Sequence, residues 1–171
     1  MVTPPLQGIL KEMIRMEGCK VFKSVTILVA DDDEDDCLMI GDAFKESGFC
    51  SDLRFVEDGE ELMDYLHHRG KHADPSLSPH PGLVLLDLNM PKKDGREALR
   101  EIKGDPRTRD IPVVILTTSN EHADILRSYE TGASSFIVKP MTFERLVAVI
   151  KALSNYWFDI VELPLERQVH S

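Results

Sequence analysis

Polar residues that can carry out chemistry stand at the ends of apolar runs at four places in the chain. Asp31 and Asp32 follow VTILVA, Asp87 follows LVLL, Thr117 follows IPVVIL, and Lys139 follows SFIV. An ionised carboxylate beside such apolar runs costs free energy unless it is hydrated, paired or bound to a metal. The positions of these side chains therefore indicate a functional role.

The three carboxylates would repel one another strongly if they met, unless a divalent cation were bound between them. Hard oxygen ligands with few protein contacts and room for water suit Mg²⁺. A carboxylate beside Mg²⁺ can act as nucleophile toward a phosphoryl donor, which gives an aspartyl phosphate. The metal, the ammonium group of Lys139 and the hydroxyl group of Thr117 can then hold the three phosphoryl oxygens.

The apolar runs predict the strands that must bring these residues together. LVLL before Asp87 is apolar throughout, as expected of a strand buried on both faces of a parallel sheet. Apolar residues at helical spacing separate each strand from the next. The expected strands span residues 25–30, 52–56, 83–86, 111–116 and 135–138, and the expected helices span 35–47, 59–67, 96–103, 122–130 and 143–153.

Five alternations of strand and helix predict an α/β fold, in which right-handed crossovers place helices on both faces of a parallel sheet. In the flavodoxin-like arrangement, a five-stranded sheet of order 2-1-3-4-5, the first and third strands are neighbours. Ligands of such folds bind outside the carboxyl ends of the strands. All the polar residues named above would lie at that edge, so we expect them to converge there.

The helix expected at residues 122–130 is weakly anchored to the rest of the domain. Beyond alanine, its only strongly apolar residues are Ile125, Leu126 and Tyr129. Elements with few apolar contacts open at a low cost in free energy. This helix is therefore the part of the domain that we expect to move.

The composition fits one domain with tails and excludes several classes of protein. The chain has 171 residues, of which 42% are apolar, and a net charge of −10. This charge argues against nonspecific binding to nucleic acid or to anionic lipid. No apolar run is long enough to cross a membrane, and the first residues lack the features of a secretory signal. We therefore expect a cytoplasmic protein that binds neither nucleic acid nor membranes.

The cysteines and histidines give no strong metal signal. Cys19, Cys37 and Cys50 are odd in number and lack CxxC spacing, which favours free thiols in a reducing compartment over disulfides or a zinc site. The segment HHRGKHADPSLSPHPG reads as a long surface loop. Its histidines are irregularly spaced, which favours ordinary solvated side chains over a metal site. They are His67, His68, His72 and His80.

Four motifs together resemble the receiver domain of two-component response regulators: DDD after an apolar strand, LLDLNMPKKDG, LTTS and FIVKP. The resemblance covers about residues 25–154. It implies that Asp87 accepts a phosphoryl group from a histidine kinase. It also implies that Asp31, Asp32, Asp87 and the backbone carbonyl of Asn89 hold Mg²⁺.

The same resemblance implies roles for residues of the fourth and fifth strands. Thr117 would be the switch hydroxyl, and Lys139 would be the lysine that binds the phosphoryl group, with its bond to Pro140 in the cis form. Phe136 matches the aromatic switch position, where family members often carry Tyr. Phenylalanine keeps the coupling through its rotamer and loses one hydrogen bond.

A narrower resemblance is to the stand-alone response regulators that partner bacterial phytochromes. It depends on the acidic start of the first helix, the long loop before the third strand, the TTS sequence and the tail motif YWFDIVELP. It implies a phytochrome-type histidine kinase as partner, and a homodimer. The chain then divides into an N-terminal tail at 1–23, the receiver domain at 24–154 and a C-terminal extension at 155–171 that acts as a dimerisation arm.

The tail motif exposes more apolar surface than a free terminus should. It either folds back on its own domain or crosses to a second copy, and the resemblance favours the second copy. The expected interface residues are Tyr156, Trp157, Phe158 and Ile160.

Three classes of function compete. The leading one is a phosphoacceptor that catalyses its own labelling and signals through a changed surface, without being a turnover enzyme. The second is a pseudo-receiver that is never phosphorylated and acts as a structural dimer. The third is a phosphatase of the aspartyl-phosphate type, which would need an Asp two residues after the nucleophile, where this chain has Asn89. The sequence does not distinguish an endpoint of signalling from a relay.

Overall fold

Five parallel strands form the centre of the structure, a computed structural model that describes residues 25–165 of the chain. The strand order is β2-β1-β3-β4-β5. The predicted fold class is therefore confirmed, including the strand order and the adjacency of the first and third strands. The strands are β1 (Thr26–Ala30), β2 (Asp52–Val56), β3 (Leu83–Leu86), β4 (Val113–Thr117) and β5 (Ser135–Val138).

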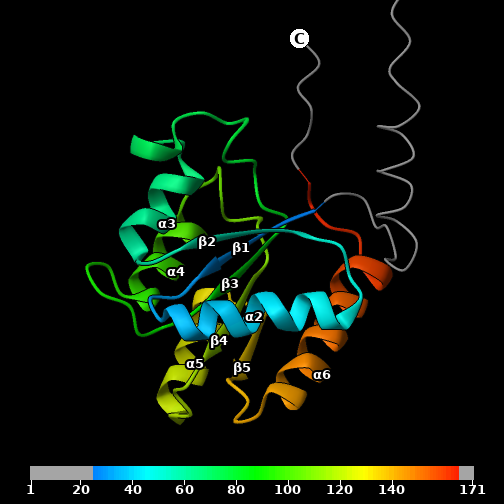
Figure 1. The fold of residues 1–171 in the computed structure, drawn as a ribbon. Helices are drawn as coiled ribbons and strands as arrows, with labels where there is room; N and C mark the ends of the chain where they lie inside the picture. Colours follow the sequence, from blue (N-terminus) through cyan, green and yellow to red (C-terminus); the bar gives the residue numbers. More distant parts are fainter. Residues whose placement is uncertain (1–24, 166–171) are drawn as a thin grey trace, which may run out of the picture.

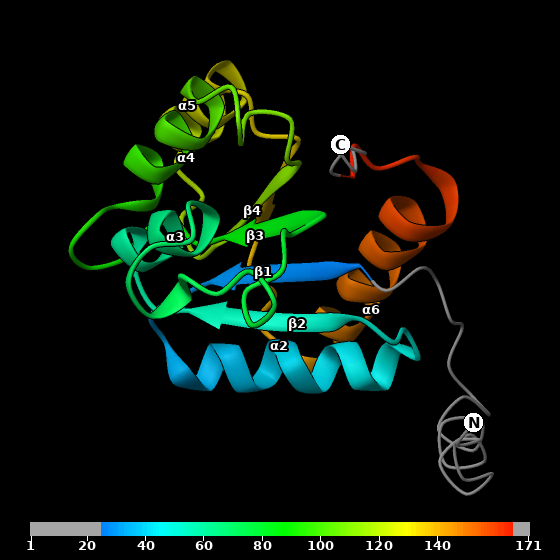
Figure 2. The same ribbon diagram turned by 90° about the horizontal axis from the view of Figure 1, so that it is seen from above.

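The helices cover both faces of this sheet (Figures 1 and 2). Two helices, α2 and α6, pack side by side on one face, and α3, α4 and α5 lie on the other. This is the layered arrangement that right-handed β-α-β crossovers produce. The bounds are α2 (Glu34–Ser47), α3 (Gly59–Leu66), α4 (Gly95–Gly104), α5 (His122–Thr131) and α6 (Phe143–Ser154).

Two apolar layers, one on each face, hold the helices to the sheet. In β1, Ile27 and Val29 belong to the layer under α2 and α6, whereas Leu28 and Ala30 belong to the layer under α3 and α4. The side chains of β3 are all buried and divide between the two layers in the same way. A strand buried on both faces needs apolar residues at every position, which explains the unbroken LVLL run.

The run of acids after β1 is divided between the site and the start of a helix. Helix α2 begins at Glu34, one residue before the predicted start, because the Asp33 side chain accepts a hydrogen bond from the backbone N–H of Asp36 at 3.0 Å. Such a cap satisfies a backbone donor that has no partner within the helix, and the acids of the first turn interact favourably with the helix dipole.

Strand β4 begins at Val113, two residues later than predicted. Pro112 has no N–H group to donate to a neighbouring strand, although its carbonyl oxygen accepts a hydrogen bond from Val84. The apolar pattern alone could not locate this start, since Ile111 is buried like the strand itself.

The loop before β3 is more ordered than its composition indicates. It contains a short 3₁₀ helix, η1 (Gly70–His72), and the His72 ring lies between Ser78 and Glu61 at 3.0 and 3.1 Å. The Tyr65 hydroxyl donates to the backbone of the same loop. The side chain of His72 is only 14% exposed, so this histidine is held within the loop and is not simply solvated.

The C-terminal extension folds back on its own domain as far as it is described. After α6 the chain forms a short π-helix, η2 (Asn155–Ile160). There Trp157 and Phe158 pack against the apolar layer under α2 and α6. Farther on, Leu165 lies close to Gly82 at the amino end of the sheet, where an added Cβ would be 3.3 Å from Leu165 and would collide with Val25 at 2.6 Å.

Two expectations from the sequence are wrong. The expectation of free thiols is confirmed for Cys37 but is wrong for Cys50, which forms a disulfide. A disulfide depends on Cα atoms lying about 4.4 to 6.8 Å apart, and sequence spacing does not reveal this distance. No described peptide bond is cis, so the Lys139–Pro140 bond is trans. A trans X–Pro bond is favoured by about 0.5 to 1 kcal/mol unless packing selects the other form.

The predictions for the N-terminal tail at 1–23, Cys19 included, fall on residues that lie outside the described part of the chain. No helix among the described residues is both long enough and apolar enough to cross a bilayer.

Candidate functional site

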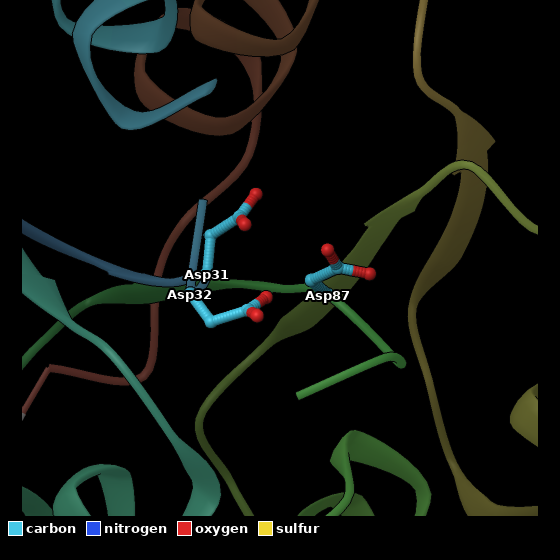
Figure 3. A group of neighbouring side chains, drawn as sticks. All are labelled: Asp31, Asp32 and Asp87. Carbon is cyan, nitrogen blue, oxygen red and sulfur yellow. The ribbon is translucent and has the colours of Figure 1, made fainter. Parts of the chain in front are cut away.

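Three carboxylates meet at the carboxyl edge of the sheet. Asp31 and Asp32 follow β1, and Asp87 follows β3, which is hydrogen-bonded to β1. The backbone N–H of Asp87 donates to the carbonyl of Ala30 at 2.9 Å, which fixes the register of the two strand ends. Figure 3 shows the three side chains side by side at the ends of these strands, and one oxygen of each lies within 4.8 Å of the others.

A close backbone approach holds the loop after Asp87 against the sheet. The N–H of Gly95 donates to the Leu88 carbonyl at 2.9 Å. A Cβ at Gly95 would collide with the backbone of Asp87 and Leu88. Glycine at this position therefore lets α4 begin directly beside the site, which explains the Asp-Gly pair in the central motif.

Lys139 is the cation of the site and has three carboxylate partners. Its Nζ atom lies 2.7 Å from an oxygen of Asp31, 2.9 Å from Oδ2 of Asp87 and 2.6 Å from Oδ2 of Asp36. Only 11% of the lysine side chain is exposed. The structure thus brings together residues from the ends of β1, β3 and β5, and adds one from the first turn of α2.

Burial and pairing compete at Asp31 and Lys139. Burial is the largest influence on Asp31 and raises its pKa, although the hydrogen bond from Lys139 acts in the opposite direction. Burial also acts to lower the pKa of Lys139, but hydrogen bonds to Asp31, Asp36 and Asp87 outweigh it and raise that pKa. The ammonium group therefore stays charged, while the crowded carboxylates are held at a cost in free energy.

The two oxygens of the Asp87 carboxylate have different partners. Oδ1 accepts a hydrogen bond from the Thr117 hydroxyl at 2.8 Å and one from the backbone N–H of Asn89 at 3.2 Å. Oδ2 accepts from Lys139. Thr117 is completely buried. The hydroxyl of Thr117, the residue expected to be the switch, is thus turned toward Asp87.

The aromatic residue of β5 lies between the core and the surface. Phe136 is partly buried and packs against the apolar layer under α3 and α4. Its backbone N–H donates to the Tyr129 hydroxyl of α5 at 3.1 Å. Helix α5 itself buries only Asp124 and Ser128, both polar, so its weak apolar anchoring, inferred from the sequence, agrees with the structure.

The predicted interface residues lie apart from this edge, on η2. Tyr156 and Ile160 are half or more exposed, with 50% and 72% of their surfaces accessible. Trp157 and Phe158 are instead packed against their own domain. The four residues therefore divide into two that face outward and two that anchor the extension.

Sequence reasoning missed three charged residues near the site. Asp36 was assigned only to the start of a helix, although it lies in the same acidic run as Asp31 and one turn beyond it. Arg96 and Asp124 form a partly buried ion pair between the first turns of α4 and α5, with Arg96 Nη2 2.6 Å from Asp124 Oδ2. The only signal for this pair is that both residues shortly follow a strand that ends in a functional residue.

The donor set fits a hard divalent cation. Three carboxylate oxygens converge, and Asp32 is exposed to solvent at the rim, so water could complete the coordination. No histidine or thiolate belongs to the group, which disfavours zinc. The residues present therefore match the ligand chemistry expected of Mg²⁺ or Mn²⁺.

Comparison with known proteins supports the same interpretation of this site. The family model described as the response regulator receiver domain matches residues 27–151. Response regulator Rcp1 of Synechocystis sp. (strain PCC 6803) is 37% identical over 138 residues, which are 81% of this chain and 92% of Rcp1. A solved structure of the Mn²⁺-bound form of Rcp1 superposes with a TM-score of 0.74 at 36% identity, covering 82% of this chain and 99% of that one.

Two further solved structures are similar over nearly their whole length. The phosphorylated cyanobacterial phytochrome response regulator RcpA is 38% identical with a TM-score of 0.77, covering 82% of this chain and 99% of RcpA. Response regulator RPA3017, in red light signaling of R. palustris, is 37% identical with a TM-score of 0.79, covering 83% of this chain and 99% of its own.

Proposed function

The chain belongs to the response regulator receiver domain family, and from this premise we propose that Asp87 is its phosphoacceptor, supplied by a histidine kinase. The observation that carries the proposal is that the two oxygens of the Asp87 carboxylate have different hydrogen-bond donors. One oxygen is held by the Thr117 hydroxyl and the Asn89 N–H, and the other by Lys139. These are the hydroxyl and ammonium groups that a phosphoryl group on Asp87 would need.

The reaction is a transfer of a phosphoryl group between two side chains. An oxygen of Asp87 attacks the phosphorus of a phosphohistidine, the new O–P bond forms, and the N–P bond breaks as the leaving imidazole takes up a proton. Hydrogen-bond donors fixed in advance at the site of developing charge are the main source of acceleration in such steps. Lys139 and Thr117 would supply them here.

The metal would be held by Asp31, Asp32, Asp87 and the backbone carbonyl of Asn89. When bound, Mg²⁺ would neutralise charge on the transferring phosphoryl oxygens. The carboxylates converge as this role requires. The choice of Mg²⁺ over Mn²⁺ is part of the proposal, since both ions suit oxygen ligands.

Signalling would follow from a shift between conformations of α5 and β5. The Thr117 hydroxyl would exchange its bond to the Asp87 carboxylate for a bond to a phosphoryl oxygen, and the packing of Phe136 beside α5 would change with it. The weak apolar anchoring of α5 makes this change inexpensive. The protein would therefore act by presenting an altered surface, and we do not expect it to be a turnover enzyme.

The input is proposed to come from a phytochrome-type histidine kinase in the cytoplasm. The similarity to RcpA, a phytochrome response regulator, and to RPA3017 supports this proposal. The division into an N-terminal tail at 1–23, a receiver domain at 24–154 and an extension at 155–171 belongs to the same proposal. The net charge of −10 favours a protein partner over nucleic acid or an anionic membrane.

The extension is proposed to form a homodimer through its outward-facing residues. Tyr156 lines a groove of about 560 Å³ together with Ile137 and Leu153, and Ile160, on the same π-helix as Tyr156, is exposed. An apolar groove next to exposed apolar side chains suits a self-complementary contact. Replacing Ile160 with Ser should lower the mass measured by light scattering, whereas Leu77→Ser, an equally exposed leucine in the loop before β3, should not. Equal masses for both variants would exclude this interface.

Phosphotransfer profiling tests the proposed function most broadly. Each candidate histidine kinase is first labelled on its histidine and then mixed with this protein for a short time. We expect one kinase to transfer its phosphoryl group markedly faster than the rest, and we expect Asp87→Asn to receive none. Transfer to Asp87→Asn at the rate of the wild type would mean that another residue accepts the phosphoryl group, and transfer from no kinase would favour a structural pseudo-receiver.

A further inference from the structure

A closed ring of hydrogen bonds begins and ends at one oxygen of Asp87. On one side, the backbone of Asn89 donates to Asp87 Oδ1, and the Asn89 side-chain oxygen accepts from Arg96 at 3.5 Å. On the other side, the Thr117 hydroxyl donates to the same Oδ1 and accepts from the backbone N–H of Ser119 at 3.4 Å. The hydrogen bonds on the two sides of the ring therefore pass through the loops that follow β3 and β4, next to Asp87.

The ring closes through Asp124 on α5. Arg96 donates to both oxygens of this carboxylate, from Nε at 2.8 Å and from Nη2 at 2.6 Å. The Ser119 hydroxyl donates to Asp124 Oδ2 at 2.7 Å. Only 7% of Asp124 is exposed. Paired bonds between a guanidinium and a buried carboxylate fix direction as well as distance, so this closure is a rigid one.

The ring determines where two polar side chains point. The Asn89 and Ser119 side chains bond to Arg96 and Asp124, while their backbone N–H groups bond to Asp87 and Thr117. The backbone of each residue thus faces Asp87 or Thr117, and its side chain is hydrogen-bonded to Arg96 or Asp124 instead. A side chain committed in this way is not available to orient a water molecule at Asp87.

We propose that Arg96 and Asp124 are positioning residues that prolong the aspartyl phosphate by holding the Asn89 and Ser119 side chains away from it. This inference rests on the proposed phosphorylation of Asp87. Loss of the phosphoryl group is hydrolysis: water attacks phosphorus, the O–P bond to Asp87 breaks, and the carboxylate, inorganic phosphate and a proton are released. A hydroxyl or amide near the in-line position would help to orient this water.

The test measures the lifetime of the phosphoryl group after labelling with acetyl phosphate and Mg²⁺ and removal of the donor. Arg96→Gln and Asp124→Asn should each shorten the lifetime by roughly threefold to tenfold, which lies at the lower end of the couplings measured within one hydrogen-bond network. The double variant should be no shorter than either single variant, since the ring is already open. Arg100→Gln, on the exposed side of the same helix, should keep the wild-type lifetime.

A further variant separates positioning from a general loss of structure. If the released Ser119 hydroxyl is what speeds hydrolysis, then adding Ser119→Ala to Arg96→Gln should restore most of the lifetime. Arg96→Lys keeps the charge but cannot make the paired bonds, so it should resemble Arg96→Gln. Lifetimes of all the labelled ring variants equal to that of Arg100→Gln would overturn the proposal.

A second measurement tests the ring without any phosphodonor. Amide hydrogen exchange at Asn89 and Ser119 should be faster in Arg96→Gln than in Arg100→Gln, because both loops lose their common anchor. Equal exchange in the two variants would overturn the ring as a positioning device. Failure of the wild-type protein to be labelled would instead count against the proposed function, so the two failures are distinguishable.

Discussion

Two basic side chains in this structure each have more than one carboxylate partner, but the geometry of their contacts differs. The single nitrogen Nζ of Lys139 contacts the carboxylates of Asp31, Asp36 and Asp87. The guanidinium group of Arg96 donates two hydrogen bonds to Asp124 and one to Asp94. An ammonium group is a point charge with rotatable donors, whereas a guanidinium is a planar fork of fixed geometry.

The balance between burial and pairing also differs between the two clusters. At Asp31, burial dominates and raises the pKa. At Asp124, the hydrogen bond from Arg96 dominates and lowers the pKa to about 2. The lysine cluster is therefore held at a cost and can exchange one of its carboxylates for a phosphoryl oxygen. The arginine cluster is stable as it stands and braces the loops around the site.

Exchanging the cation of the first cluster should have the largest effect. In Lys139→Arg, the charge remains, but a planar fork cannot converge on three carboxylates at once. We expect the rate of labelling by acetyl phosphate to fall by about 10²-fold, as when a preorganised donor is removed from an active site. Arg96→Lys, the reverse exchange, should leave this rate within about twofold. Equal losses in both variants would mean that the geometry of the donor matters equally in both clusters, and no loss in either would mean that charge alone matters.

The second-largest effect is expected in the pH dependence of the free energy of unfolding, through Asp124 of the arginine cluster. The folded-state pKa of Asp124 is lowered from 3.8 to about 2, so its contribution to stability is present above about pH 4 and is lost as pH falls through about 2. Asp124→Asn should therefore be less stable than the wild type at about pH 6, by on the order of 1 kcal/mol. This difference should shrink toward pH 2. Urea denaturation at a series of pH values measures it, and a difference that does not vary with pH would contradict the assigned role of the Arg96 bond.

The smallest effect is expected at the third partner of the lysine. Asp36 competes with a phosphoryl group for Lys139, since its oxygen lies 2.6 Å from the ammonium nitrogen. Asp36→Asn should therefore speed labelling by acetyl phosphate by roughly threefold, a change of less than 1 kcal/mol. Asp35→Asn removes the same charge from the neighbouring position and serves as the control. If both variants speed labelling equally, the cause is the loss of one negative charge near the site rather than the loss of the Asp36 contact with Lys139.

The lysine cluster could largely be predicted from the sequence, because each member is attached to a strand end. The strands are marked by their apolar runs, and the carboxyl ends of parallel strands share one edge, so Asp31, Asp87 and Lys139 had to converge once the strand order was known. The fold class followed from the same alternation of strands and helices. The position of β4 was off by two residues because Pro112 interrupts the ladder without interrupting the apolar pattern.

The arginine cluster could not be predicted in this way. Arg96 and Asp124 lie on the first turns of two different helices, and their contact depends on how those helices pack, which apolar periodicity does not specify. The contact between Asp36 and Lys139 was also not predicted, because an acid in the first turn of a helix is already explained by its interaction with the helix dipole. The disulfide at Cys50 likewise depends on a distance that only the folded chain determines.

The most direct test of the account is the intact mass of the protein after incubation with acetyl phosphate and Mg²⁺, followed by peptide mapping. The account predicts one phosphoryl group per chain, located on Asp87, no adduct in Asp87→Asn, and none when the metal is removed with a chelator. An unmodified wild-type mass, or an adduct that persists in Asp87→Asn, would contradict the claim that this edge of the sheet is built to accept a phosphoryl group.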